Sequence, residues 1–293
     1  NLDFLASEAH DLPLRQRSMR AVFDTSWRLL TQVEQRVFQQ LSVFRGSFTR
    51  SAAQAVTGAS LPVLIGLIHK SFLQRAPTDR YQIHELVRQF TEEKLAETST
   101  DYTAAQEQHS RYYLTFLTQR TPGLQGAQQP ALLNEIEQEL ANIRRGWLWA
   151  ARQGNFDLIN GVLDGLYDYY QTRSQHPAGI EAFTQAIHLL EQNMTDTSAQ
   201  HRLNRLQARH GALCWGLAHY EQAHPLLQAS LDIARNLQDK KEIAFCLEFL
   251  GRTVWQKGDL AAVGYLEESL AFSRALDDQV AIATTLHTLA AVF

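Results

Sequence analysis

Apolar and polar positions follow a helical period along most of the chain. From Thr31 onward, apolar residues recur every three or four positions, which places them on one face of a helix. Glu34 follows Thr31 at the spacing of a capping box, a common helix start. Gly46 and Gly58 end the first two predicted helices, and a third ends at His69. The first part of the chain is therefore predicted to form three short helices.

The pattern then changes to short extended runs. Residues 71–75 and 80–84 are strand-like segments around a turn cluster, Pro77-Thr78-Asp79, which is typical of a β-hairpin. A helical pattern returns at residues 85–96. Three helices, a hairpin and a closing helix predict a winged helix-turn-helix domain over residues 31–97.

Helical hairpins are predicted beyond this domain. The apolar period indicates helices at residues 102–119, 131–153 and 156–172, and His176-Pro177 marks a further turn. These segments predict a series of helical hairpins over residues 102–200.

A sequence repeat occupies the last third of the chain. Gly211 and Gly251 are 40 residues apart, and Ser230 and Ser269, each followed by Leu, are 39 apart. Small residues at fixed positions allow paired helices to pack closely, and the pattern resembles a tetratricopeptide (TPR) array. We predict TPR-like repeats over residues 201–293, with the last repeat truncated. The predicted fold is thus mainly α: a winged helix-turn-helix followed by an α-solenoid of TPR-like hairpins.

Composition and charge favour an ordinary folded protein rather than a nucleic-acid binder. The 293 residues are 45% hydrophobic and 20% charged, with a formal net charge of -4. Residues 1–97 carry 12 basic and 10 acidic residues, which is far from the basic field of a nucleic-acid-binding domain. The two cysteines, Cys214 and Cys246, are predicted to be buried thiols in a reducing compartment. No apolar run approaches the roughly 18 residues of a membrane span, and no signal peptide opens the chain, so we expect a cytoplasmic protein that continues beyond both ends.

Catalytic and metal-binding patterns are not found in the sequence. Lys70 and Ser71 resemble the end of a phosphate loop, but His69 precedes them where that loop has Gly. No Gly-x-Ser-x-Gly motif occurs, and neither cysteine has the surroundings of a nucleophile. The eleven histidines lack the spacing of metal ligands. We therefore predict no catalytic residue and no metal site.

The third predicted helix bears on DNA binding. A recognition helix needs exposed Arg, Lys, Asn or Gln near its N-terminus to reach base edges. The segment from Leu61 is apolar, and its one charge, Lys70, is at the other end. We therefore predict a buried helix and expect no nucleic-acid partner for this part of the chain. A DNA-binding transcriptional regulator stays open as an alternative, as does a constitutive TPR scaffold for a protein partner.

Six segments together resemble a known family. They are Asp11–Val22, Ser26–Leu30, Leu41–Phe48, His69–Leu73, Ile83–Glu85 and Glu139–Trp147. In this combination the chain resembles the C-terminal part of a STAND-type, NB-ARC-like bacterial signalling ATPase, over nearly its whole length. Ile83-His84-Glu85 is similar to the apolar-His-acidic triplet of that family, with Ile in place of the commoner Met and Glu in place of Asp.

The resemblance implies a regulatory switch rather than an enzyme. The ATPase core of the family is absent from this chain, so no catalysis is expected of it, and residues 1–30 correspond to a linker or helix from the preceding domain. His84 falls on the position that contacts the phosphate of bound ADP in the closed state. ADP or ATP is therefore expected as a cofactor of the full-length protein only, with the ATPase core as an intramolecular partner. Without the resemblance, His84 is predicted to be half-buried and hydrogen-bonded to a neighbouring strand.

The resemblance also makes the repeats the sensor. In such arrays the first helix of each pair lines the concave face, where Trp215, Glu248, Arg252 and Trp255 are expected to project. Tryptophan and arginine are common anchors in binding sites. These four residues are the candidates for binding an inducer, either a protein or a small molecule. The alternative is that Trp215 and Trp255 fill the seams between repeats.

Overall fold

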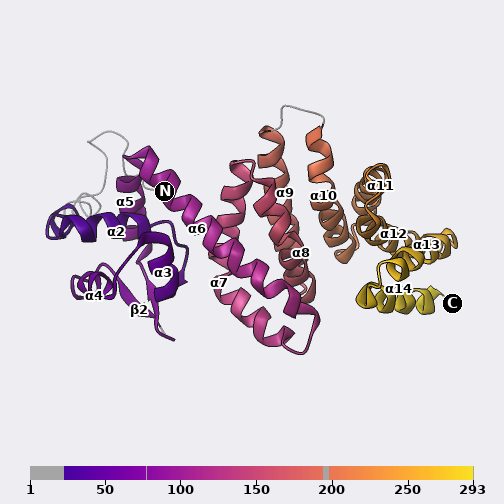
Figure 1. The fold of residues 1–293 in the computed structure, drawn as a ribbon, viewed down its shortest axis with the longest axis horizontal. Coiled ribbons are helices and arrows are strands. Elements are labelled where there is room, and N and C mark those ends of the chain that lie inside the picture. The colour runs from indigo at the N-terminus through magenta and orange to yellow at the C-terminus, as the bar shows by residue number, and fades with distance from the viewer. Residues whose placement is uncertain (1–22, 77, 194–197, 293) are drawn as a thin grey trace. The chain divides into compact units, whose positions relative to one another are not determined.

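The computed structural model describes residues 23–76, 78–193 and 198–292. The described chain is mainly helical, as predicted, and its elements follow one another from α2 to α14 in Figure 1. Of the predicted linker at residues 1–30, the first 22 residues lie outside the described part.

The chain forms two compact units. The first comprises the residues up to Tyr113 together with Gln138–Trp149, and the second comprises Leu114–Glu137 and the chain from Ala150 onward. The division passes through two helices, α6 (Ser99–Arg120) and α7 (Gln129–Arg152). It therefore does not test the domain bounds predicted from the sequence, which stay predictions.

The first unit contains the predicted winged helix. Its elements are α2 (Gln32–Leu41), β1 (Ser47–Phe48), α3 (Arg50–Thr57), α4 (Leu61–His69), β2 (Gln74–Ala76), β3 (Arg80–Gln82) and α5 (Glu85–Ala96). Parts of α6 and α7 complete the unit. The bounds of α5 agree with the prediction at both ends.

A three-stranded antiparallel sheet forms the wing, in the order β1-β3-β2. Phe48 of β1 and Arg75 of β2 both pair with Tyr81 of β3. The predicted hairpin is confirmed, although its strands are shorter than the predicted runs. The sequence pattern does not predict β1, because two residues are too few to show the alternation of a strand.

Capping residues set the starts of the short helices α2 and α3 and the end of α3, as predicted, whereas α2 ends at Leu41 and not at the predicted Gly46. The backbone N–H of Glu34 donates to Thr31 Oγ1 at 3.2 Å, and the N–H of Thr31 donates to Glu34 Oε2 at 2.7 Å, which completes the capping box. Thr49 begins α3 by accepting from the N–H of Ala52, and Gly58, with φ of +68°, ends it. These signals are local in sequence, which is why the sequence predicts them.

The prediction that α4 is buried is wrong in part. Leu64 and Leu67 are fully buried, but Ile65 is 38% exposed and Pro62 is exposed. The helix is apolar on all sides, so its pattern does not indicate which face the core covers. Among the described residues no single helix combines the length and the apolar composition of a membrane span; α3 and α4 meet that test only jointly, across a bend of 108°.

The second unit consists of helical hairpins. It contains η2 (Thr121–Gln125), α8 (Phe156–Thr172), α9 (His176–Gln192), α10 (Ser198–Gly216), α11 (Tyr220–Asn236), α12 (Lys240–Trp255), α13 (Ala261–Ala275) and α14 (Gln279–Val292). The helices predicted around residues 102–172 are confirmed as α6, α7 and α8. The turn predicted at His176-Pro177 is wrong by a few residues: it lies just before, around Ser174, and Pro177 occupies the first turn of α9.

The repeat glycines lie where paired helices come closest. A Cβ atom on Gly251 of α12 would lie 2.7 Å from Cγ of Leu266 on α13, and one on Gly211 of α10 would lie 3.0 Å from Cγ of Leu227 on α11. Both leucines are fully buried. The matching environments confirm the repeat and explain the small residue at this position in both units.

Candidate functional site

A cavity of about 580 Å³ lies within the second unit. Its walls come from the end of α6, from η2, and from α8, α10, α12 and α14 with the turn before it. These are the first helices of the hairpins, and in the described part of the unit no lining residue comes from the second helices α9, α11 or α13. The cavity therefore lies on the face where a TPR-like array is expected to bind ligands.

Arg209 on α10 is the central cation of the cavity wall. Its side chain is 2% exposed and donates to Glu242 Oε2 at 2.7 Å and to Asp164 Oδ1 at 2.9 Å. The guanidinium also lies over the ring of Phe245, 3.7 Å from the ring centroid. Burial alone would lower the pKa of Arg209, but the carboxylates of Glu242 and Asp164 outweigh burial and raise it. Arg209 thus stays charged and joins α8, α10 and α12.

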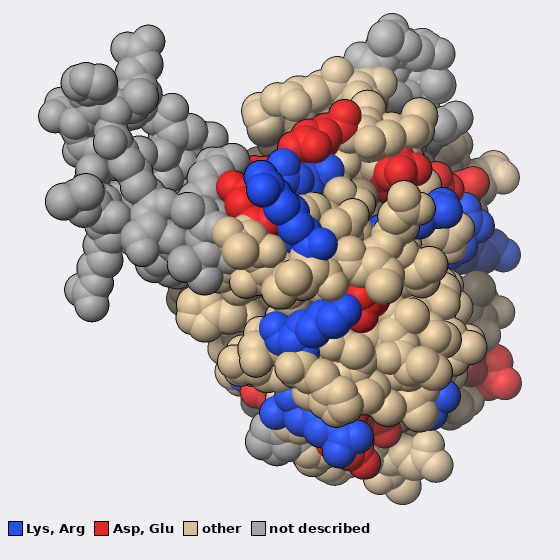
Figure 2. Space-filling view, turned by 90° about the vertical axis from the view of Figure 1, so that its left-hand side faces the viewer, with Lys and Arg blue, Asp and Glu red and all other residues tan. Residues whose placement is uncertain are grey.

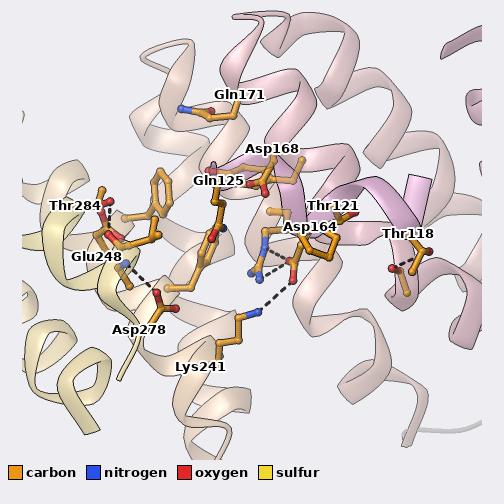
Figure 3. Close-up of a pocket in the computed structure, with 18 of the residues that line it drawn as sticks. Thr118, Thr121, Gln125, Asp164, Asp168, Gln171, Lys241, Glu248, Asp278 and Thr284 are labelled. Carbon is orange, nitrogen blue, oxygen red and sulfur yellow. Dashed lines mark hydrogen bonds and ion pairs between the residues drawn. The ribbon is translucent and has the colours of Figure 1, made fainter. Parts of the chain in front are cut away.

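Asp164 on α8 is fully engaged with cations. Arg209 donates to it, Arg205 Nη2 donates at 2.9 Å, and Lys241 Nζ lies 3.4 Å away. Burial alone would raise the pKa of Asp164, but Arg209 and Arg205 hold it at about 2. Figure 3 shows Lys241 reaching Asp164 from below.

Asp168 lies one helical turn further along α8 and behaves differently. It lines the cavity, and within the described residues no hydrogen bond or ion pair reaches its carboxylate. Burial, and then repulsion by Asp164, raises the pKa of Asp168 to about 6. In Figure 3 no contact line joins Asp168 to its neighbours. At neutral pH the group is therefore an ionised, partly buried carboxylate without a counter-ion from the described chain.

Tyr167 is next to Asp168 and also lines the cavity. The residue is 7% exposed, and its hydroxyl has no hydrogen-bond partner among the described residues. Its ring packs edge-on against Phe245, with centroids 5.7 Å apart. Burial raises the pKa of Tyr167, so the hydroxyl stays protonated.

Two of the four predicted binding residues lie in the cavity wall. Glu248 and Arg252, one turn apart on α12, form an ion pair with Nη2 to Oε1 at 2.7 Å. Burial raises the pKa of Glu248 even though Arg252 opposes this shift. The guanidinium of Arg252 lies 5.1 Å from the ring centroid of Phe249, another wall residue. The structure thus brings this predicted pair together at the cavity.

The two predicted tryptophans lie elsewhere. Trp215 of α10 packs edge-on against Phe249 at 5.7 Å and lies 5.2 Å from the guanidinium of Arg252, so it supports the wall from behind. Trp255 is half-buried at the end of α12, and neither tryptophan is among the lining residues. Ligand binding by any of the four predicted residues stays a prediction.

Several wall residues are not singled out by the sequence. Asp164 and Asp168 are four residues apart in a helix whose other positions are mostly apolar, and this spacing is a signal that could have identified them. Arg209 and Glu242 are 33 residues apart on different helices. No local pattern relates that pair, so only the structure reveals it.

His84 is the predicted nucleotide-contacting residue, and it caps α5. Its Nδ1 accepts a hydrogen bond from the N–H of Leu86 at 3.4 Å, and the side chain is exposed. The predicted half-buried histidine bonded to a neighbouring strand is therefore wrong. An acceptor Nδ1 leaves the proton on Nε2, which becomes an outward-facing donor. Glu85 instead pairs with Arg88 at 2.7 Å, and the hydrogen bonds from Arg88 outweigh burial and hold the pKa of Glu85 at about 2.

One imidazole is not a nucleotide site. Phosphate groups are held by several backbone N–H groups and cations together. His84 alone therefore does not form a nucleotide site, and its contact to a nucleotide stays a prediction. Among the described residues there is no cluster of three or more His, Cys, Asp or Glu side chains that could hold a metal ion. Both cysteines are buried, and burial raises the pKa of Cys246 to about 12, so its thiol is not activated.

Charges of both signs mix on the face of the molecule drawn in Figure 2. Lys and Arg side chains lie beside Asp and Glu across a surface that is mostly uncharged. Lys70, the one charge at the end of α4, is itself paired with Glu34 at 2.6 Å. The described residues of this face therefore offer no continuous basic field for a duplex.

Comparisons with known proteins place the chain near larger regulators. No family model matches it. Proteins of Mycobacterium bovis and Mycobacterium tuberculosis, each described as "Putative HTH-type transcriptional regulator", are 25% identical over 287 residues. The match covers 93% of this chain, and the chain spans about a third (32%) of the length of these relatives. The chain thus resembles one part of a longer regulator.

The comparison with solved structures also gave a match. It is the crystal structure of a signal transduction ATPase with numerous domains (STAND) protein with a tetratricopeptide repeat sensor, from Pyrococcus horikoshii. The match covers 96% of this chain and 51% of that one, with 14% sequence identity and a TM-score of 0.33. At this TM-score the likeness carries no argument about function.

Proposed function

We propose that this chain is the regulatory and ligand-sensing portion of a STAND-type signal-transduction ATPase. In this proposal the TPR-like hairpins bind an inducer, and the winged helix responds to the nucleotide of the full-length protein through His84. The observation that carries the proposal is the cavity of about 580 Å³ on the first helices of the hairpins. Its volume lies within the roughly 300–1,000 Å³ of small-molecule sites.

The position of the cavity gives a physical route from binding to signalling. In a helical array each repeat contacts only its neighbours, so the curvature of the array depends on small angles between repeats. A ligand that touches both α8 and α12 bridges repeats that are not neighbours, because the repeat of α10 lies between them. Binding then favours one arrangement of the repeats over the others, which is a population shift.

The wing supplies the second part of the proposal. Nδ1 of His84 is occupied by the N-cap bond, so Nε2–H faces outward at the start of α5. A bound ADP would supply anionic phosphate oxygens, to which such a donor forms a charge-assisted hydrogen bond. His84 would hold α5 in the closed state while this contact lasts. Under this proposal catalysis belongs to the ATPase core outside this chain, and a cytoplasmic location stays a prediction.

The nucleotide part is tested in the full-length protein with two variants of His84. His84→Ala removes both the cap and the donor, whereas His84→Asn keeps a capping side chain and removes only the imidazole. We expect both variants to purify with less bound ADP than the wild type and to self-associate more readily. His69→Ala, which removes another exposed imidazole from the same domain, should retain ADP. If both His84 variants retain as much bound ADP as the wild type, His84 acts only as a helix cap.

The sensing part is tested by filling the cavity. Gly161 lines it, and a Cβ there would meet no atom within 4 Å. Gly161→Phe should therefore abolish the binding of ligands found in a small-molecule thermal-shift screen. Gly264→Phe, at an exposed glycine of α13 with equally open surroundings, should leave that binding intact. If the ligands bind the wild type, Gly161→Phe and Gly264→Phe equally well, the ligand-binding site does not lie in this cavity.

The DNA-binding alternative is supported by the mycobacterial relatives, which are described as HTH-type transcriptional regulators. If this alternative holds, the chain should retard duplex DNA in an electrophoretic mobility-shift assay. The affinity should fall steeply with salt concentration, because phosphate contacts release counter-ions. A constitutive scaffold would bind its protein partner equally well with and without ADP in the full-length protein.

A further inference from the structure

The cations around the cavity already have partners. Arg209 donates to Asp164, Lys241 Nζ lies 3.4 Å from Asp164, and Arg252 donates to Glu248 at 2.7 Å. An anionic ligand would have to displace one of these carboxylates to gain a counter-ion. The cavity is therefore not arranged to receive a negative charge.

The carboxylates of the cavity are also accounted for, with one exception. Asp278 accepts from the backbone N–H of Ala281 at the start of α14, at 3.0 Å. Asp168 has no partner among the described residues. The wall thus contains one more carboxylate than its own cations and backbone donors satisfy.

Two further features surround this carboxylate. The hydroxyl of Tyr167, a residue that is more than nine-tenths buried, lines the same cavity without a hydrogen-bond partner in the described chain. The rings of Phe245 and Phe249, 4.9 Å apart, line the same cavity, and Phe245 packs against Tyr167. An unsatisfied anion, an unsatisfied hydroxyl and an aromatic wall are complementary to a cation carried on an apolar body.

We propose that the cavity binds the ammonium or guanidinium group of a ligand with an apolar body, with Asp168 as its ion-pair partner and Tyr167 as a hydrogen-bond acceptor. This inference rests on the proposed sensing function and names the ligand chemistry. Burial and Asp164 raise the pKa of Asp168 to about 6, so its charge is retained at neutral pH against an unfavourable environment. A bound cation would remove that unfavourable state, which makes the pairing selective.

Calorimetric titration of the 293-residue chain at pH 7.5 tests the inference with two matched pairs of probes. The first pair is phenethylamine and the neutral 2-phenylethanol. The second is acetyl-Phe-Arg-amide and its uncharged citrulline counterpart. We expect the cationic member of at least one pair to bind about tenfold or more tightly than the neutral one. Preference for the amine pair would indicate a small-molecule inducer, and preference for the peptide pair a basic peptide segment.

Variants assign the selectivity to its residues. Asp168→Asn should abolish the preference for the cationic probe. Tyr167→Phe should lower the affinity for the cationic probe several-fold. Asp157→Asn removes the same charge from an exposed position of the same helix and should change neither value. Asp168→Asn should melt at or above the wild-type temperature, because the folded state no longer holds a buried charge. This keeps loss of binding distinct from loss of folding.

The outcomes separate this inference from the function on which it rests. Failure of both cationic probes to bind, equal affinity for charged and neutral probes, or an unchanged preference in Asp168→Asn would each overturn the inference. If neutral or anionic ligands from the thermal-shift screen bind the wild type but not Gly161→Phe, the sensing function stands and the cation assignment fails. If no ligand depends on the cavity, the sensing function fails as well.

Discussion

Arg209→Met is expected to destabilise the second unit strongly. The substitution keeps the apolar stem of the side chain and removes the cation that faces Glu242, whose side chain is 1% exposed. Breaking a buried pair by removing one partner costs about 3–5 kcal/mol, because the other charge stays buried. Arg205 still donates to Glu242 at 2.9 Å, so we expect the lower end, about 3 kcal/mol. That corresponds to a fall of roughly 6–12 °C in the melting temperature.

The loss should depend on pH with a defined sign. In the wild type the folded-state pKa of Glu242 lies below the ordinary value of 4.5 for this carboxyl, because Arg209 outweighs burial. This carboxylate therefore adds stability above pH 4.5 and loses it as the pH falls through the folded-state pKa. In Arg209→Met burial dominates and raises the folded-state pKa of Glu242. The free energy of unfolding of the variant then falls further below that of the wild type as the pH rises above 4.5. The difference should therefore be larger at pH 7 than at pH 4.5.

Urea unfolding followed by circular dichroism at the two pH values measures this deficit. Arg209→Met combined with Glu242→Gln should recover most of the stability at pH 7, because no buried charge is left unpaired. The control is Arg235→Met, which breaks an ion pair with Glu268 whose members are 46% and 41% exposed. It should cost at most about 1 kcal/mol. A deficit below that of the control, or one that is equal at both pH values, would refute the reasoning.

Three further predictions concern packing, capping and reactivity. Gly251→Ala should destabilise the repeats by about 1–3 kcal/mol in urea unfolding, because its Cβ would lie 2.7 Å from Leu266, whereas Gly264→Ala should stabilise α13 by up to about 1 kcal/mol; equal effects would contradict the close approach of the helices. Thr31→Ala removes the capping box and should lower the stability of the first unit by about 1 kcal/mol, with Thr31→Ser restoring it. Cys246, whose pKa is raised to about 12 by burial, should react with iodoacetamide only after unfolding, as mass spectrometry of the native and urea-treated protein would reveal.

From the sequence, residues of the candidate site could be predicted only by the face of the helix on which they lie. Because the first helix of each pair is expected to line the concave face, Glu248 and Arg252 were predicted there, and both line the cavity. The same reasoning placed Trp255 there, but it lies outside the wall, because a helical face does not specify how far along the helix a cavity extends. The four-residue spacing of Asp164 and Asp168 could have marked Asp168 as a candidate, but no sequence pattern reports that its carboxylate lacks a partner among the described residues.

The sequence by itself determined where several helices begin and end. α5 (Glu85–Ala96) and α8 (Phe156–Thr172) agree with their predicted bounds, because caps and the 3.6-residue period act over neighbouring positions. Only the tertiary structure decided which face of the apolar helix α4 is covered, and that β1 exists as a partner of β3. It also decided that Arg209 pairs with carboxylates from two other helices, whereas Asp168 forms no ion pair with a cation of the described residues. Those outcomes depend on contacts between residues far apart in the chain, and a local pattern carries no information about them.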